Sequence, residues 1–241
     1  MLADADFSGL IARLPPELRP QAAPGTWEVA LAQLPSGGKV LCAGAGRGGL
    51  SQVLVQAGYD VESADLHAEH FVAPGLSCRQ VDFLQPLPYP DGEFDVVLVV
   101  EVVEHLENPW SFLREAVRAL RADGLLVFTT PNVDSLASRM TFARKGLLPY
   151  FRDESFFGCY HVTPIFRWAV ERWCTTTTAS IRNVAYSRAN WPTATDVPRY
   201  ERGVTRRLKE LLPVNEMTGE IACYTIVKTG AQTLAVGTHY G

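Results

Sequence analysis

The stretch that decides the fold is VLCAGAGRGG, residues 40–49, where a short apolar run meets a segment with helical spacing. Glycines at 44, 46 and 48 let the backbone approach a ligand closely, because a Cβ atom would occupy that space. The start of the following helix points its free N–H groups at a carboxylate or phosphate. Taken alone, the pattern also fits a plain glycine-rich turn, so the neighbouring segments must decide.

Those neighbouring segments predict one doubly wound α/β domain. The run FDVVLVV at residues 94–100 is rich in β-branched residues, which is typical of a central parallel strand buried on both faces. Strands alternate with helices, and this predicts a parallel sheet with helices on both faces. We expect strands over residues 39–43, 60–64, 77–81, 94–100, 125–130, 181–187 and 221–227, helices over 48–56, 108–121 and 164–174, and a turn at 122–124.

A chain of 241 residues is long enough for one such domain. Residues 134–162 follow the fifth strand and mix aromatic with basic side chains, so they fit a lid over the site or a small satellite core with solvated charges. We divide the single domain 1–241 into an N-terminal arm (1–25), a ligand-binding core (38–132), a lid and variable region (133–218), a final strand (219–228) and a tail (229–241).

Charge and composition exclude several classes of protein. The formal net charge of −4 disfavours long nucleic acid as a partner, although a basic cluster stands late in the chain at Arg199, Arg202, Arg206, Arg207 and Lys209. No apolar run approaches the ~20 residues that span a bilayer, and no secretory signal is evident. The five cysteines form no CxxC pair. We therefore expect a cytoplasmic protein with reduced thiols.

Two acids extend the glycine pattern into a nucleoside site. Asp65 follows the second strand, where a carboxylate accepts hydrogen bonds from both ribose hydroxyls. Asp82 follows the third strand and is placed to accept from an adenine amino group, with Phe83 packing nearby. Each acid alone fits a helix N-cap or a solvated loop. Glycines and two acids in order on three successive strands favour an adenosine ligand.

The ordered segments VLCAGAGRG, SADL, VDF, FDVVLVVEVVEH and RADGLLVFTTPN resemble the class I S-adenosylmethionine-dependent methyltransferase family over residues 38–132. The resemblance implies a Rossmann-like, seven-stranded, mostly parallel sheet with an antiparallel final hairpin, and S-adenosylmethionine in its cleft. Cys42 stands where the family usually carries an acid, so Glu101 takes over its task or the protein is a non-catalytic member. The implied cofactor residues are Gly44, Ala45, Gly46, Gly48, Asp65, Leu66, Asp82, Phe83 and Glu101.

The motif Glu101-Val102-Val103-Glu104-His105 ends the central strand. It resembles the Glu-x-x-Glu-His motif of ubiquinone-pathway and small-RNA O-methyltransferases, and in the small-RNA group two acids and two histidines hold a divalent cation. The resemblance makes Glu101, Glu104, His105 and His161 candidate ligands of Mg²⁺, Mn²⁺, Fe²⁺ or Zn²⁺. Glu104 and His105 also fit an acid–base pair, with His105 as the base. The alternatives are that Glu101 serves only the cofactor pocket, that Glu104 and His105 cap the following helix, and that His161 is a helix-cap or loop residue.

We therefore expect methyl transfer from S-adenosylmethionine to a hydroxyl of a small molecule or saccharide. An RNA 2′-O-methyltransferase is the first alternative, and the acidic net charge disfavours it. The second alternative is a non-catalytic, cofactor-binding regulatory protein, which Cys42 suggests.

Overall fold

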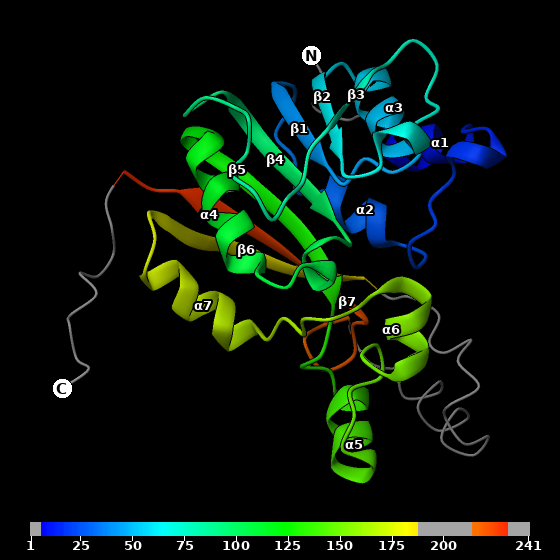
Figure 1. Ribbon diagram of the computed structural model, residues 1–241, viewed down its shortest axis with the longest axis vertical. Helices are drawn as coiled ribbons and strands as arrows, with labels where there is room; N and C mark the ends of the chain where they lie inside the picture. Colours follow the sequence, from blue (N-terminus) through cyan, green and yellow to red (C-terminus); the bar gives the residue numbers. More distant parts are fainter. Residues whose placement is uncertain (1–5, 188–213, 231–241) are drawn as a thin grey trace.

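The sheet has seven strands in the order β3-β2-β1-β4-β5-β7-β6 (Figure 1). The computed structural model describes residues 6–187 and 214–230. Strands β1 to β5 pair in parallel, and β7 pairs antiparallel with both β5 and β6. The predicted mostly parallel sheet with an antiparallel final hairpin is thus confirmed. The strands are β1 Lys39–Ala43, β2 Asp60–Asp65, β3 Cys78–Gln80, β4 Phe94–Val100, β5 Leu120–Pro131, β6 Ala179–Ser187 and β7 Ile221–Lys228.

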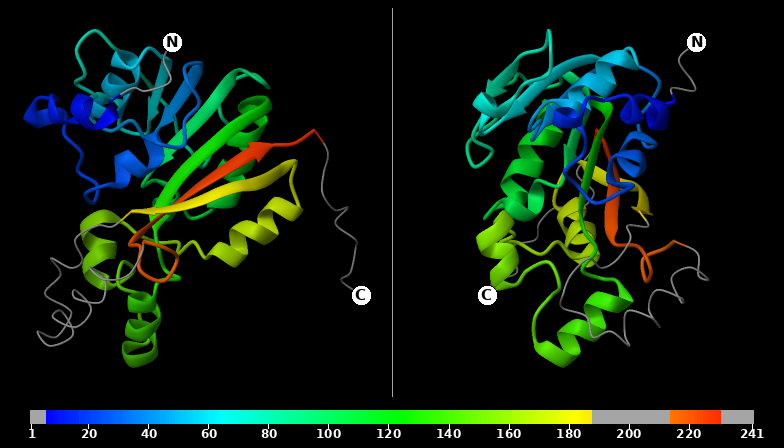
Figure 2. Two further views of the ribbon diagram at one scale, coloured as in Figure 1. Left: turned by 180° about the vertical axis from the view of Figure 1, so that it is seen from behind. Right: turned by 90° about the vertical axis from the view of Figure 1, so that its right-hand side faces the viewer.

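Helices cover both faces of this sheet (Figure 2, right). One face packs against α1 to α3 and the other against α4 and α7, so the domain has two apolar layers. The helices are α1 Phe7–Ala12, α2 Thr26–Leu31, α3 Gly49–Gln56, α4 Pro109–Ala119, α5 Leu136–Lys145, α6 Asp153–Cys159 and α7 Arg167–Thr175, with 3-10 turns η1 Pro16–Leu18, η2 Ala68–His70 and η3 Val103–His105.

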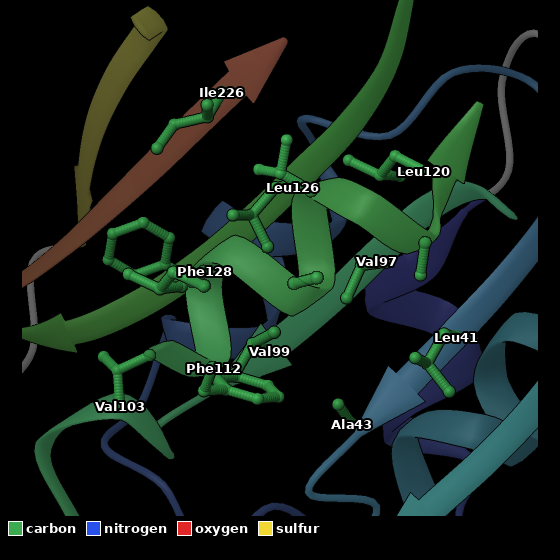
Figure 3. Packing of buried hydrophobic residues seen from close by; sticks show 14 of the residues in the cluster. Leu41, Ala43, Val97, Val99, Val103, Phe112, Leu120, Leu126, Phe128 and Ile226 are labelled. Carbon is green, nitrogen blue, oxygen red and sulfur yellow. The ribbon is translucent and has the colours of Figure 1, made fainter. Parts of the chain in front are cut away.

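Helix α4 shows how the sequence fixes one of these layers (Figure 3). The Asn108 side chain accepts a hydrogen bond from the Ser111 N–H, and Pro109 occupies the first turn, where its missing N–H costs nothing. Phe112 lies against the central strands with the other apolar residues of its face. At the other end, the Lys228 ammonium donates to the Leu120 carbonyl at 2.6 Å just past the helix terminus.

The structure corrects two predicted boundaries. The predicted turn at 122–124 is wrong, since these residues lie within β5; Leu120 already pairs with Phe94, and a left-handed Asp123 (φ 60°) accompanies a register shift in the ladder. The predicted helix from Pro164 begins instead at Arg167. The N–H groups of Val162 and Thr163 both donate to the Glu104 carbonyl, which keeps that segment extended.

Two further expectations concern the membrane and the thiols. Across residues 6–187 and 214–230, no helix is long and apolar enough to cross a bilayer. Cys42, Cys78, Cys174 and Cys223 are free thiols. The basic cluster at residues 199–209 lies outside the described part of the chain.

The N-terminal arm is tied to the glycine-rich turn after β1. The Arg47 side chain donates from Nε to the Glu17 carbonyl at 2.8 Å. The Leu18 carbonyl oxygen lies where a Cβ atom on Gly49 would stand. Glycine is therefore required at this position by close backbone approach, at an ordinary helical conformation.

We predict that Gly49→Ala lowers the free energy of unfolding by about 2 kcal/mol, because the new methyl group must displace the backbone of the arm. Urea denaturation followed by circular dichroism measures the change. Gly158→Ala is the matched control, since a Cβ there meets nothing within 4 Å, and it should leave stability unchanged or slightly increased. Equal effects of the two changes would show that the arm does not pack on Gly49.

Candidate functional site

The glycine-rich turn lies where the parallel strands β1 and β4 end side by side. Backbone N–H groups of Gly44 and Ala45 donate to the Ala64 carbonyl at 2.8 and 3.0 Å, which fastens the turn to β2. Gly44 and Gly48 have φ of 79° and 92°, and a Cβ on Gly44 would overlap Val102. A Cβ on Gly46 would meet nothing within 4 Å. Gly46 thus borders open space, as a ligand-facing backbone requires.

Asp65 lies at the end of β2, against this turn. Its carboxylate accepts from the Gly46 N–H through Oδ2 and from the His67 N–H through Oδ1, both at 2.8 Å. These two bonds fix the carboxylate at the edge of the glycine turn with lone pairs remaining for further donors. The next residue, Leu66, is exposed. This geometry suits a ligand with paired hydroxyls lying beside Gly46.

Asp82 and Phe83 follow β3, one strand further out. The exposed Asp82 carboxylate accepts from the Leu84 N–H at 2.9 Å, which forms a local turn. The Phe83 ring is buried and packs on Phe112, with ring centroids 4.9 Å apart. Phe83 is therefore part of the core under α4, and its ring does not line the cavity described next.

A cavity of about 500 Å³ opens beside the glycine turn, within the usual size range of small-molecule sites. Three parts of the chain beyond the turn meet around it: the end of β4 with η3, the segment after β5, and the N-terminal arm. The N-terminal arm was not predicted to line the cavity, since no motif marks it. The residues that line the cavity include Leu18, Arg19, Trp27, Gly44, Ala45, Gly46, Glu101, His105, Tyr150 and His161.

Glu101 stands at the end of β4 in a left-handed conformation with φ of 53°, which is uncommon for a side chain larger than glycine. Its backbone N–H donates to the Thr129 hydroxyl at 3.0 Å, and that hydroxyl donates to its carboxylate at 2.9 Å. Burial raises the pKa of Glu101 to about 7. Cys42, by contrast, is buried in the core and lies outside the cavity lining. Glu101 is thus the acid that lines this wall of the cavity.

The side chains of Glu104, His105 and His161 lie close together, and the two histidines also line the cavity. Their potential ligand atoms all lie within 4.8 Å of one another. The two imidazole rings meet edge to face with centroids 4.8 Å apart. Glu101, the fourth expected ligand, lies outside this group, and its carboxylate accepts a hydrogen bond from the Thr129 hydroxyl on β5. The structure therefore brings together three of the four predicted ligands.

The Glu104 carboxylate is fully buried, and no described residue meets it at full hydrogen-bond geometry, although the Thr130 side chain lies close enough to lower its pKa. Burial, and then the nearby Glu101 carboxylate, raise the pKa of Glu104 well above its ordinary value. An unpaired buried carboxylate is costly unless a positive charge compensates it. A cation between Glu104 and the two imidazoles would supply that charge.

Two contacts hold His161 in this position. Its Nδ1 lies 2.9 Å from the Tyr150 carbonyl oxygen, which can only accept a hydrogen bond and therefore selects the tautomer with Nδ1–H. The Nε2 lone pair then remains for a cation, as in metal-binding histidines with a carbonyl partner. The Thr163 hydroxyl donates to the Leu106 carbonyl at 2.6 Å and fastens the segment after His161 to η3. Burial, followed by the neighbouring His105, lowers the pKa of His161.

We predict that Glu104→Gln raises the free energy of unfolding by at least about 1 kcal/mol at pH 8 with a chelator present, because it removes a buried charge without changing shape. Thermal denaturation followed by fluorescence provides the measurement. Glu107→Gln, an exposed position three residues later, should change little. Destabilisation by Glu104→Gln would mean that the carboxylate has a partner in solution.

Residues 41–128 match the family model described as "Methyltransferase domain". The chain is 32% identical over 108 residues to the ubiquinone biosynthesis O-methyltransferase of Psychrobacter arcticus, covering 40% of this chain and 42% of that protein. It is 33% identical over 102 residues to the 2-methyl-6-phytyl-1,4-hydroquinone methyltransferase of Synechocystis, covering 39% and 32%. The similarity thus spans less than half the length of these curated relatives.

Solved structures share the whole fold at lower identity. A SAM-dependent methyltransferase from Archaeoglobus fulgidus superposes with a TM-score of 0.53 at 19% identity, covering 79% of this chain and 86% of its own. An S-adenosylmethionine-dependent methyltransferase from Mesorhizobium loti superposes with a TM-score of 0.57 at 15% identity, and the match covers 84% of this chain and 97% of that one. The sheet and its helices therefore have the fold of these methyltransferases.

Proposed function

We propose that this chain, whose residues 41–128 match a methyltransferase domain, transfers a methyl group from S-adenosylmethionine to a hydroxyl of a small-molecule or saccharide acceptor. One observation carries the proposal: a single cavity is bounded both by the glycine turn and by the histidines of the Glu104–His105–His161 cluster. A cofactor site and a site able to activate a hydroxyl are thereby adjacent.

The glycine turn and two acids would hold the cofactor. Gly46 offers open backbone next to the fixed Asp65 carboxylate, which suits the two ribose hydroxyls. Glu101 would accept from the amino group of the methionine part, the task usually given to the acid that Cys42 replaces. Because Glu101 lines the cavity, the cysteine at position 42 does not leave the cavity without an acid, and this favours the catalytic over the non-catalytic alternative.

When bound, S-adenosylmethionine supplies a methyl group on a positively charged sulfur, which transfers as an electrophile. The chain must then place an oxygen nucleophile opposite and accept its proton. His105 lines the cavity, and an imidazole is the side chain most often used as a general base. The cavity lining also includes Arg19, Trp27 and Tyr150, which would exclude water from the reacting groups.

A divalent cation fits the Glu104, His105 and His161 cluster as a mixed carboxylate–imidazole set, which suits Mn²⁺, Fe²⁺ or Zn²⁺ and admits Mg²⁺. Such a cation would lower the pKa of a hydroxyl oxygen and orient it. His105 would then act as a ligand through its neutral imidazole, and the bound hydroxyl would lose its proton to solvent. Without a cation, His105 remains the base.

The relatives support a small-molecule acceptor. One is named for ubiquinone biosynthesis and the other for a hydroquinone. The net charge of −4 disfavours the RNA alternative, since phosphate binding requires concentrated Lys and Arg. A methyl-transfer assay against sugars, catechols and RNA ends, with and without divalent cations, distinguishes these acceptor classes.

We predict that S-adenosylhomocysteine binds the wild-type protein and that Asp65→Ala weakens binding at least about tenfold, because a charge-assisted pair of hydrogen bonds is lost. Isothermal titration calorimetry gives the two affinities. Asp60→Ala is the control, since Asp60 is exposed at the opposite end of the same strand. No binding of the cofactor product by folded wild-type protein would refute the proposed cofactor site.

We also predict that a chelator abolishes methyl transfer, that Mn²⁺ restores it, and that His161→Ala lowers Mn²⁺ affinity at least about tenfold. The loss follows from removing one of three protein ligands. His70→Ala, an exposed histidine outside the cavity lining, serves as the control. Full activity in chelator, together with a large loss in His105→Ala, would contradict the cation and leave His105 as a base alone.

A further inference from the structure

The ladder between the neighbouring strands β4 and β5 ends with the pair Val100 and Thr129, and Val100 lines the cavity (Figure 1). One residue further on, Glu101 leads the chain out of the sheet in a left-handed conformation, with φ of 53°. A glutamate rarely adopts this conformation unless its surroundings hold it there. The side chain of Thr129 on β5 supplies the contact that holds it.

The Thr129 hydroxyl makes two hydrogen bonds to Glu101 at once. It accepts from the Glu101 backbone N–H at 3.0 Å and donates to Glu101 Oε1 at 2.9 Å. Because a hydroxyl carries one proton and an N–H can only donate, the two bonds together fix the direction in which the hydroxyl points. The first bond gives the Glu101 N–H a partner where the ladder ends, and the second bond orients the carboxylate.

This contact leaves part of the Glu101 carboxylate for a ligand. Oε1 is bonded to Thr129, while Oε2 and the remaining lone pairs can accept from a further donor. Glu101 lines the cavity together with Gly44 and Gly46 of the glycine turn. Under the proposed function, this carboxylate receives the ammonium group of the methionine part of the cofactor. The position of the carboxylate therefore decides how well that group is bound, since hydrogen bonds weaken steeply with poor geometry.

The place of Thr129 in β5 directs its hydroxyl to Glu101. The side chains of Thr129 and Thr130 are both fully buried. Successive residues of a strand point to opposite faces of the sheet, so the two threonines reach different acids. Thr130 lies close to the Glu104 carboxylate, whereas Thr129 is bonded to Glu101. The Thr129 hydroxyl thus acts on the cofactor side of the cavity and not on the Glu104–His105–His161 cluster.

We propose that Thr129 is a positioning residue of the cofactor site, whose hydroxyl holds the backbone and carboxylate of Glu101 in the geometry that binds the ammonium group. Thr129 does not itself line the cavity, so it acts through Glu101. The inference rests on the proposed function, because it requires S-adenosylmethionine or its product in this cavity. Loss of the hydroxyl should weaken binding of the amino-acid part of the ligand and leave binding of the nucleoside part unchanged.

Isothermal titration calorimetry with S-adenosylhomocysteine and with 5′-methylthioadenosine separates the two parts. The second ligand keeps the adenosine and the thioether but has no amino or carboxyl group. Thr129→Val keeps the side-chain shape and removes the hydroxyl. It should weaken binding of S-adenosylhomocysteine at least about tenfold and change binding of methylthioadenosine by less than about threefold. Thr129→Ser keeps the hydroxyl and should bind S-adenosylhomocysteine within about threefold of wild type.

Thr225→Val is the matched control, since Thr225 is a buried threonine on the neighbouring strand β7 and does not line the cavity. It should leave both affinities unchanged. Circular dichroism checks that each variant folds. If Thr129→Val does not fold, Thr129→Cys is the second variant: a thiol is a weaker donor than a hydroxyl, so the loss should be smaller and again confined to S-adenosylhomocysteine.

Three results would overturn the inference in a protein whose wild type binds S-adenosylhomocysteine. The first is unchanged affinity in the folded variant that lacks the hydroxyl. The second is an equal loss for both ligands, because Thr129 would then support the whole cavity and not Glu101. The third is a loss in Thr129→Ser as large as in Thr129→Val. Absence of binding by folded wild-type protein would instead refute the proposed cofactor site, and this inference with it.

Discussion

The parallel pairing of β1 with β4 is the constraint on which the site depends. Val40 to Ala43 lie in register with Val96 to Val99, and these residues are buried. Parallel strands end at the same edge, so the glycine turn and the Glu101–His105 motif must leave the sheet side by side. Helix α4 and the N-terminal helices cover opposite faces and hold this edge in place (Figure 3). A cavity at the switch in strand order follows from that topology.

The buried carboxylates at this edge of the sheet destabilise the folded protein. The paired ends bring the carboxylates of Glu101 and Glu104 near each other, and burial raises the pKa of both. Among the described residues, only the Thr130 side chain and the backbone of Glu104 itself lie close enough to the Glu104 carboxylate to oppose this shift. Strain and uncompensated charge that persist in a folded protein cluster at functional sites. Under the proposed function, the cofactor and a cation would compensate the charge that folding alone leaves unmatched.

Much of the fold was predictable from the sequence, since the strands and their terminal motifs follow local patterns. The FDVVLVV run predicted β4 at its observed bounds, and the order of strands with their terminal motifs predicted the sheet. The start of β5 at Leu120 was not predictable, because pairing of Leu120 with Phe94 overrides the local turn signal at residues 122–124. The remaining features of the site depend on long-range contacts, which local sequence patterns do not reveal. Glu101 accepts a hydrogen bond from Thr129 and lies outside the Glu104–His105–His161 group, and the N-terminal arm reaches the cavity with no motif to mark it.

The central claim is that one cavity holds the cofactor at the glycine turn and a cation at the neighbouring cluster. The most direct measurement is a crystal structure grown with S-adenosylhomocysteine and Mn²⁺, with anomalous scattering recorded at the manganese edge. The account predicts one anomalous peak bounded by Glu104, His105 and His161, and a ligand whose ribose meets Asp65. A bound ligand with no peak at the cluster, or a ligand lying away from the glycine turn, would contradict it.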